Sequence, residues 1–120
     1  MQLSGVCIYT ENAPQLAAFY EIALRETPTA EGEHYGFAQS QLAVYNPGNV
    51  RLSERKNMSL MFYCEDIAAE YARVTTQIPG IGIVSPPERR PWGAYSFWFT
   101  DPDGNMVSFI EKASVSNAQT

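Results

Sequence analysis

The sequence predicts an α+β fold of two βαβββ modules, whose strands form a curved mixed sheet with a concave cleft. The first observation is a repeat, because residues 5–12 align with residues 59–66 and each copy reads as a strand, an acidic residue and a helix cap. The second is a strong turn signal at residues 101–105, which lies between two apolar runs. A repeated unit that cannot close its own core is expected to pack on its copy. We therefore expect two modules in one domain.

The chain has the composition of a single soluble domain, with 120 residues, 45% hydrophobic and 18% charged. Its net charge of −5 argues against a nucleic-acid partner and mildly favours neutral or cationic ligands. No apolar run reaches transmembrane length, and residues 1–4 lack the features of a signal peptide. Cys7 and Cys64 fall in predicted strands and are expected to be free, buried thiols. These observations predict a cytoplasmic protein with no membrane partner.

The first module is predicted over residues 1–46. Residues 3–10 alternate as a strand, and Asn12 is the expected cap of a helix that ends near Leu24. The helix carries one apolar stripe at the i, i+3, i+4, i+7 spacing, formed by Leu16, Phe19, Tyr20 and Ala23. Three further stretches complete the module: a short edge strand within 27–32, a strand at 34–39, and a strand at 41–45 after a tight turn at Ser40.

A polar and charged segment, residues 47–57, is the predicted linker to the second module at residues 58–112. The second module begins with a strand at 59–64, and Asp66 is the expected cap of a helix that Pro79-Gly80 ends. An irregular edge strand follows at 82–90, because Pro86-Pro87 interrupts it. Residues 113–120 are small and polar and are expected to form a frayed tail.

The last two strands are expected on either side of Asp101-Pro102-Asp103-Gly104-Asn105. Proline presets the first corner of a type I turn, aspartate accepts hydrogen bonds from its own backbone, and glycine takes the left-handed position. Aromatic and β-branched residues flank the turn, which makes it the strongest strand–turn–strand signal in the chain.

The chain resembles the vicinal-oxygen-chelate superfamily, which includes glyoxalase I, bleomycin-resistance proteins and extradiol dioxygenases. The resemblance rests on Pro91-Trp92-Gly93, on Phe97-x-Phe99-x-Asp-Pro-Asp-Gly-Asn, on the Phe19-Tyr20 pair and on the two βαβββ units. It implies a concave cleft in which the family's enzymes hold a divalent metal with His, Glu and Gln ligands. The matching positions here are Gly5, Ala43, Ser59 and Ser108. Because these residues are poor ligands for such a metal, the chain is similar to the metal-free, bleomycin-resistance-like branch, and no cofactor is expected.

Alternation along the strands places aromatic and methionine side chains on the predicted concave face. Tyrosine, tryptophan and methionine there favour a planar or amphipathic ligand. The expected ligand-binding residues are Tyr9, Tyr45, Met61, Tyr63, Trp92, Trp98 and, as the sole histidine, His34. Plain packing is the alternative for the strand aromatics, and a surface position is the alternative for His34. No catalytic residue is assigned.

Three functions are compatible with this pattern. The leading prediction is a homodimer that binds a small organic molecule without changing it, as in antibiotic sequestration. The alternative is a lyase, isomerase or dioxygenase of the same superfamily with a non-standard or metal-independent site. A third is an interaction module whose cleft serves dimerisation alone. The ligand's identity is not encoded in any motif that we recognise.

Overall fold

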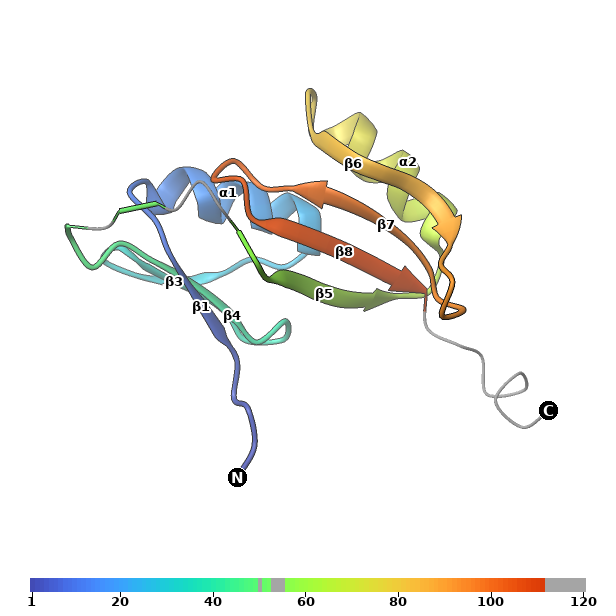
Figure 1. Cartoon of the computed structure of the whole chain (residues 1–120). Coiled ribbons are helices and arrows are strands. Elements are labelled where there is room, and N and C mark those ends of the chain that lie inside the picture. Colours follow the sequence, from blue (N-terminus) through green and yellow to red (C-terminus); the bar gives the residue numbers. More distant parts are fainter. Residues whose placement is uncertain (50, 53–55, 112–120) are drawn as a thin grey trace. The chain divides into compact units, whose positions relative to one another are not determined.

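The computed structural model describes residues 1–49, 51–52 and 56–111, which fall into two compact units (Figure 1). The first unit runs to residue 56 and also contains the turn at 101–104, while the second holds residues 57–100 and the chain from 105. The predicted tail at 113–120 lies outside the described residues, as do residues 50 and 53–55 of the predicted linker. Each unit has the βαβββ order that the repeat predicts.

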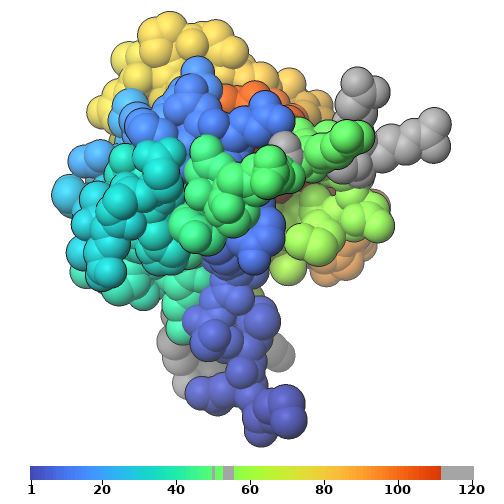
Figure 2. Space-filling model, turned by 90° about the vertical axis from the view of Figure 1, so that its left-hand side faces the viewer, coloured from blue at the N-terminus to red at the C-terminus, as the bar shows by residue number. Residues whose placement is uncertain are grey.

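The first unit is a four-stranded mixed sheet with one helix. Its elements are β1 (Val6–Tyr9), α1 (Ala13–Leu24), β2 (Thr29–Glu31), β3 (His34–Phe37) and β4 (Leu42–Tyr45). The strand order is β1-β4-β3-β2, with β1 parallel to β4 and the other pairs antiparallel. Figure 2 shows the N-terminal residues in dark blue projecting from this unit ahead of β1. Strand β2 confirms the short edge strand that was predicted within residues 27–32.

Helix α1 begins and ends where its local sequence predicts. The Asn12 side chain accepts a hydrogen bond of 3.2 Å from the Gln15 backbone N–H, which caps the first turn. Arg25 closes the helix in the left-handed conformation, with φ of 55°. The predicted apolar stripe is buried. Its burial against the sheet, rather than propensity, supplies most of the helix's stability.

Glu26, just beyond α1, holds the turn between β3 and β4. Its carboxylate accepts hydrogen bonds from the backbone N–H of Gln39 at 2.8 Å and of Ser40 at 3.1 Å, and from the Ser40 hydroxyl at 2.8 Å. Charged acceptors form the stronger class of hydrogen bond. One glutamate therefore fixes the turn that was predicted at Ser40.

The second unit repeats the architecture of the first. Its elements are β5 (Ser59–Cys64), α2 (Ile67–Gln77), β6 (Gly82–Arg89), β7 (Tyr95–Thr100) and β8 (Met106–Glu111). The order is β5-β8-β7-β6, with β5 parallel to β8. The register of β6 on β7 shifts between Ile83 and Ser85 and again between Ser85 and Glu88. The irregular edge strand is thus confirmed at the place where Pro86-Pro87 interrupts the chain.

Helix α2 covers the face of this sheet that carries the phenylalanines. The Tyr71 ring meets the Phe97 ring edge-to-face at 5.2 Å, and Phe97, Phe99 and Phe109 pack together beneath it. Asp66 caps the helix by accepting a 3.0 Å bond from the Ala69 N–H. The opposite face of the sheet is left without a helix of its own unit (Figure 1). Among the described residues, neither helix has the length and apolarity to cross a bilayer.

The Asp-Pro-Asp-Gly turn has the geometry that the sequence predicts and one contact that it does not. The Gly104 N–H donates to the Asp101 carbonyl at 2.9 Å, the Asp103 N–H donates to Asp101 Oδ1 at 2.9 Å, and Gly104 has φ of 84°. In addition, the Tyr20 hydroxyl of α1 donates to Asp101 Oδ2 at 2.6 Å. Both residues are buried. Within the first unit, this bond joins two segments that are far apart in sequence.

The prediction of two buried thiols is wrong. Cys7 is exposed and Cys64 is partly buried, and both are free. Cys7 alternates with Val6 and Ile8, so it lies on the strand face that α1 does not cover. A strand position alone does not decide burial in a sheet that has a helix on one face.

Candidate functional site

The uncovered face of the second sheet carries a pocket of about 240 Å³. Its floor follows the strand register, which places Met61 beside Ser108 and Ser108 beside Trp98 on three neighbouring strands. The lining residues are Ser59, Met61, Trp92, Ala94, Ser96, Trp98, Met106, Ser108 and Ile110. All of them belong to the second unit. Period-two alternation on β5, β7 and β8 therefore creates the pocket, because every second side chain points to this face.

The lining is apolar apart from three serine hydroxyls, and none of the lining residues carries a formal charge. Ser96 and Ser108 are buried, while Trp98 is partly exposed. A mostly apolar wall with a few fixed polar groups is typical of small-molecule sites. This surface can stack a planar ring and offer it hydrogen bonds.

Trp92 stands at the rim of the pocket on a tight turn between β6 and β7. The turn is closed by hydrogen bonds from Arg90 N–H to the Ala94 carbonyl at 2.7 Å and from Gly93 N–H to the Arg90 carbonyl at 2.9 Å. Gly93 has φ of 100°, which only glycine adopts without strain. The fixed turn leaves the Trp92 side chain 70% exposed. A large aromatic ring is thus held open to solvent beside the pocket.

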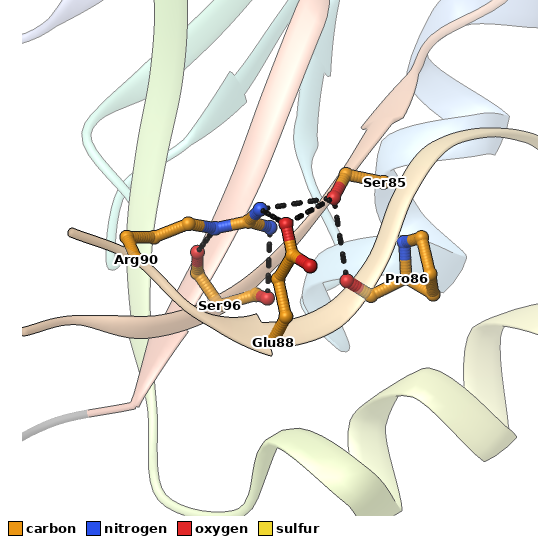
Figure 3. A network of polar contacts seen from close by, with 5 residues as sticks. All are labelled: Ser85, Pro86, Glu88, Arg90 and Ser96. Atoms are coloured by element: carbon orange, nitrogen blue, oxygen red, sulfur yellow. Dashed lines mark hydrogen bonds and ion pairs between the residues drawn. The ribbon is translucent and has the colours of Figure 1, made fainter.

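Arg90 does not line the pocket but contacts two residues that do, Ser96 and Trp98, and it lies in a network of polar contacts (Figure 3). Its Nε donates to Ser96 Oγ at 2.8 Å, its Nη2 to the Ser96 carbonyl at 3.0 Å, and its Nη1 to Ser85 Oγ at 2.9 Å. Nη1 also forms an ion pair with Glu88. The guanidinium carbon lies 4.2 Å from the centre of the Trp98 ring. Arg90 is only 6% exposed, so its charge is held against the indole away from water.

The predicted site residues divide between the two units. Met61, Trp92 and Trp98 line the pocket, while Tyr63 lies exposed on β5 and does not. Tyr9, Tyr45 and His34 form a separate aromatic cluster in the first unit. In this cluster, the ring of Tyr45 is 6.2 Å from that of Tyr9 and 5.6 Å from that of His34.

Seven residues of the pocket and its surroundings are not among the predicted site residues: Ser59, Arg90, Ala94, Ser96, Met106, Ser108 and Ile110. Met106 and Ile110 lie two residues from Ser108 on the same strand, so strict alternation would have found them. Arg90 gives no such signal, since an arginine at the end of an edge strand is normally solvated.

The positions that the family resemblance assigns to metal ligands do not fit a catalytic divalent ion. At Gly5 even a Cβ would lie 2.6 Å from the Gln41 carbonyl oxygen, so no ligating side chain can be placed there without moving the backbone. Ala43 has no donor, and Ser59 and Ser108 offer neutral hydroxyls. In the part of the chain that the structure describes, no three His, Cys, Asp or Glu side chains come together.

The cysteines are not activated as nucleophiles. Burial and, second, the negative charge of Glu70 raise the pKa of Cys64 to about 11. Partial burial also raises the pKa of Cys7. A nucleophilic cysteine requires the opposite shift, toward the thiolate.

These features define an α+β protein of two βαβββ modules with an aromatic pocket on an uncovered sheet face. The model of the Glyoxalase/Bleomycin resistance protein/Dioxygenase superfamily matches residues 3–109, and the chain belongs to this superfamily.

The chain is also similar to individual proteins. The chain is 32% identical over 74 residues to the uncharacterized protein YetH of Bacillus subtilis (strain 168), a match that covers 62% of this chain and 59% of YetH. A protein of unknown function from Agrobacterium tumefaciens str. C58 has a similar structure, with a TM-score of 0.79, 22% identity, and 94% and 95% of the two chains covered. A glyoxalase-related enzyme from Fulvimarina pelagi gives a TM-score of 0.72 at 18% identity, covering 93% and 89%. The structural matches show a shared fold.

Proposed function

We propose that this protein binds a small, planar organic molecule on the uncovered face of its second sheet, without the aid of a divalent metal. The observation that carries the proposal is the pocket in which Trp98, Met61 and the rim residue Trp92 surround three serine hydroxyls. Its volume of about 240 Å³ lies just below the usual range of about 300–1,000 Å³. A compact ligand, or one compact ring system of a larger ligand, is therefore expected.

The two tryptophans have different roles in this proposal. Trp98 is a fixed wall, because Arg90 holds one of its faces. Trp92 is the exposed group that gains most from a ligand, because binding removes its apolar surface from water. We also propose Tyr9, Tyr45 and His34 as a second aromatic contact surface in the first unit, and Tyr63 as an outlying contact on β5.

We propose sequestration, as in antibiotic resistance, as the biological role, and a cytoplasmic homodimer as the acting form. The superfamily includes bleomycin-resistance proteins, which supports the first proposal. Two free cysteines are typical of a reducing compartment. A monomer at micromolar concentration in sedimentation velocity would contradict the dimer.

A thermal-shift screen with intrinsic fluorescence tests the binding function, because both tryptophans of the chain line the pocket. Divalent metals and planar organic compounds are screened side by side. A compound at about 100 times its Kd should stabilise the fold by about 2.7 kcal/mol and quench the tryptophans. Mass spectrometry then shows whether the compound is unchanged. Stabilisation by a metal alone, or turnover of the compound, would overturn the proposal in favour of a lyase, isomerase or dioxygenase.

Two exposed methionines provide a matched pair of variants. Met58 and Met61 are 69% and 68% exposed, but only Met61 lines the pocket. Met61→Ala should weaken binding about three- to tenfold through lost apolar contact, while Met58→Ala should leave Kd unchanged. Equal effects of the two substitutions would show that the compound binds elsewhere.

A further inference from the structure

The guanidinium of Arg90 is fixed from several sides and is not free to contact a ligand. Each of its three nitrogens donates at least one hydrogen bond, to Ser96, Ser85 or Glu88. The planar group therefore keeps one orientation, with its carbon 4.2 Å from the centre of the Trp98 ring. An indole has two faces. Because Arg90 occupies one of them, a ligand in the pocket meets the other face or the edge.

A cation on one face of an indole changes what the other face attracts. The negative face of a free indole favours cations. Here a permanent positive charge already lies against the ring, and it is buried and weakly screened. Glu88 offsets part of this charge, but its side chain is mostly exposed and its own charge is screened by water. The pocket side of Trp98 therefore presents a positive potential.

Arg90 also affects the pocket through its hydrogen bond to Ser96. Arginine has only donors, so Ser96 Oγ must be the acceptor of the bond from Arg90 Nε. The hydroxyl proton of Ser96 is then left to donate elsewhere, and Ser96 lines the pocket. A hydroxyl that accepts from a cation is also polarised into a stronger donor. Ser108 supplies another hydroxyl to the same pocket.

We propose that Arg90 is a specificity-determining residue, which acts through Trp98 and Ser96 to make the pocket select planar aromatic anions over aromatic cations. The aromatic ring stacks on Trp98, and a carboxylate or phenolate oxygen accepts from Ser96. This inference rests on the proposed binding function and names its ligand class. It opposes what the net charge of −5 favours, because one buried charge beside the ligand outweighs distant charges screened by solvent.

The size of the preference follows from the geometry. A ring stacked at about 3.5 Å on the far face of Trp98 has its centre roughly 8 Å from the guanidinium carbon, which is an upper limit for a carboxylate that also reaches Ser96. At that separation, a unit charge changes affinity about 2- to 40-fold between the dielectric limits of water and a protein surface. Because Glu88 offsets part of the charge, we expect the anion to bind about tenfold more tightly than the cation.

Three probes with the same ring system test the proposal: 2-naphthoate, 2-naphthamide and 2-naphthylmethylammonium. Dissociation constants are measured at pH 7.5 by tryptophan quenching and by calorimetry. The expected order of affinity is anion, neutral amide, cation. If the three bind equally, or the cation binds best, the inference is overturned while the binding function stands. If none of the three binds and the broader screen also yields no ligand, the binding function itself is overturned.

Variants separate specificity from structural support. Ser96→Ala should weaken the anion about tenfold and leave the cation unchanged, a difference that general loosening of the pocket would not produce. Arg90→Gln should bring the anion-to-cation ratio to about one. If Arg90→Gln does not fold, Arg90→Lys keeps the charge without the planar guanidinium and should retain the order of affinities at a reduced anion-to-cation ratio.

The control variant is Arg73→Gln on α2. It removes one positive charge from the helix-covered side of the same sheet and should leave the anion-to-cation ratio unchanged. A ratio that changes as much with Arg73→Gln would show that net charge, and not Arg90, sets the preference.

Discussion

Replacing Tyr20 by phenylalanine tests the buried hydrogen bond between helix α1 and the 101–104 turn. The substitution keeps the ring and removes only the hydroxyl, which lies 2.6 Å from Asp101 Oδ2. Tyr20 is 0% exposed and Asp101 is 4% exposed, so water does not replace the lost donor. A hydrogen bond to a charged group contributes about 1.5–3 kcal/mol. We expect the free energy of unfolding to fall by about 2 kcal/mol, which lowers Tm by about 8 °C in a domain of this size.

The same bond predicts a distinct dependence on alkaline pH. Burial and, second, the negative charge of Asp101 raise the pKa of Tyr20 far above its usual value near 10. The native state therefore keeps the phenol proton at a pH where the unfolded chain releases it. The stabilisation is complete below about pH 10 and is lost above it, at up to about 1.4 kcal/mol per pH unit. The phenylalanine variant lacks this slope, so the advantage of the wild type should shrink above pH 10.

Urea denaturation at pH 7.5 and at pH 11 measures both effects, provided that the m-values of the two proteins agree. Tyr63→Phe is the control, because Tyr63 is exposed and its change should stay within about 0.5 kcal/mol. If Tyr20→Phe costs no more than this control at pH 7.5, the bond does not stabilise the fold as we argue. An undiminished wild-type advantage at pH 11 would refute the account of its pH dependence.

Three further changes follow from single contacts. Gly5→Ala should lower the free energy of unfolding, measured by chemical denaturation, by about 1–3 kcal/mol, because the new Cβ would lie 2.6 Å from the Gln41 carbonyl oxygen. An unchanged free energy would show that the backbone moves to accommodate the Cβ. Glu26→Ala should cost about 2 kcal/mol and speed hydrogen exchange at the β3–β4 turn, since three donors lose one acceptor, and unchanged exchange would contradict that role. Iodoacetamide at pH 7.5 should alkylate the exposed Cys7 before Cys64, whose pKa of about 11 leaves it little thiolate. Peptide mapping measures the order, and faster alkylation of Cys64 would contradict the exposure assigned to the two thiols.

Local signals in the sequence were sufficient for the elements and their order. Asn12 and Asp66 begin helices because their side chains accept the first free backbone N–H groups, a requirement that involves only neighbours in the chain. The turn at 101–105 forms for an equally local reason. The candidate site could be predicted only in part. Alternation placed Met61 and Trp98 on one face, but it gave no sign that Arg90 would lie against the Trp98 ring.

The sequence by itself determined the family and the two βαβββ modules, because motifs and helix caps are properties of short stretches. Only the tertiary structure decided that the face of β1 that carries Cys7 is uncovered, and therefore that Cys7 is exposed. It also decided the partners of Tyr20 and Arg90. In the unfolded chain, water solvates the Tyr20 hydroxyl and the Arg90 guanidinium. Packing of distant segments removes this water, and each group then binds a partner that the local sequence does not specify.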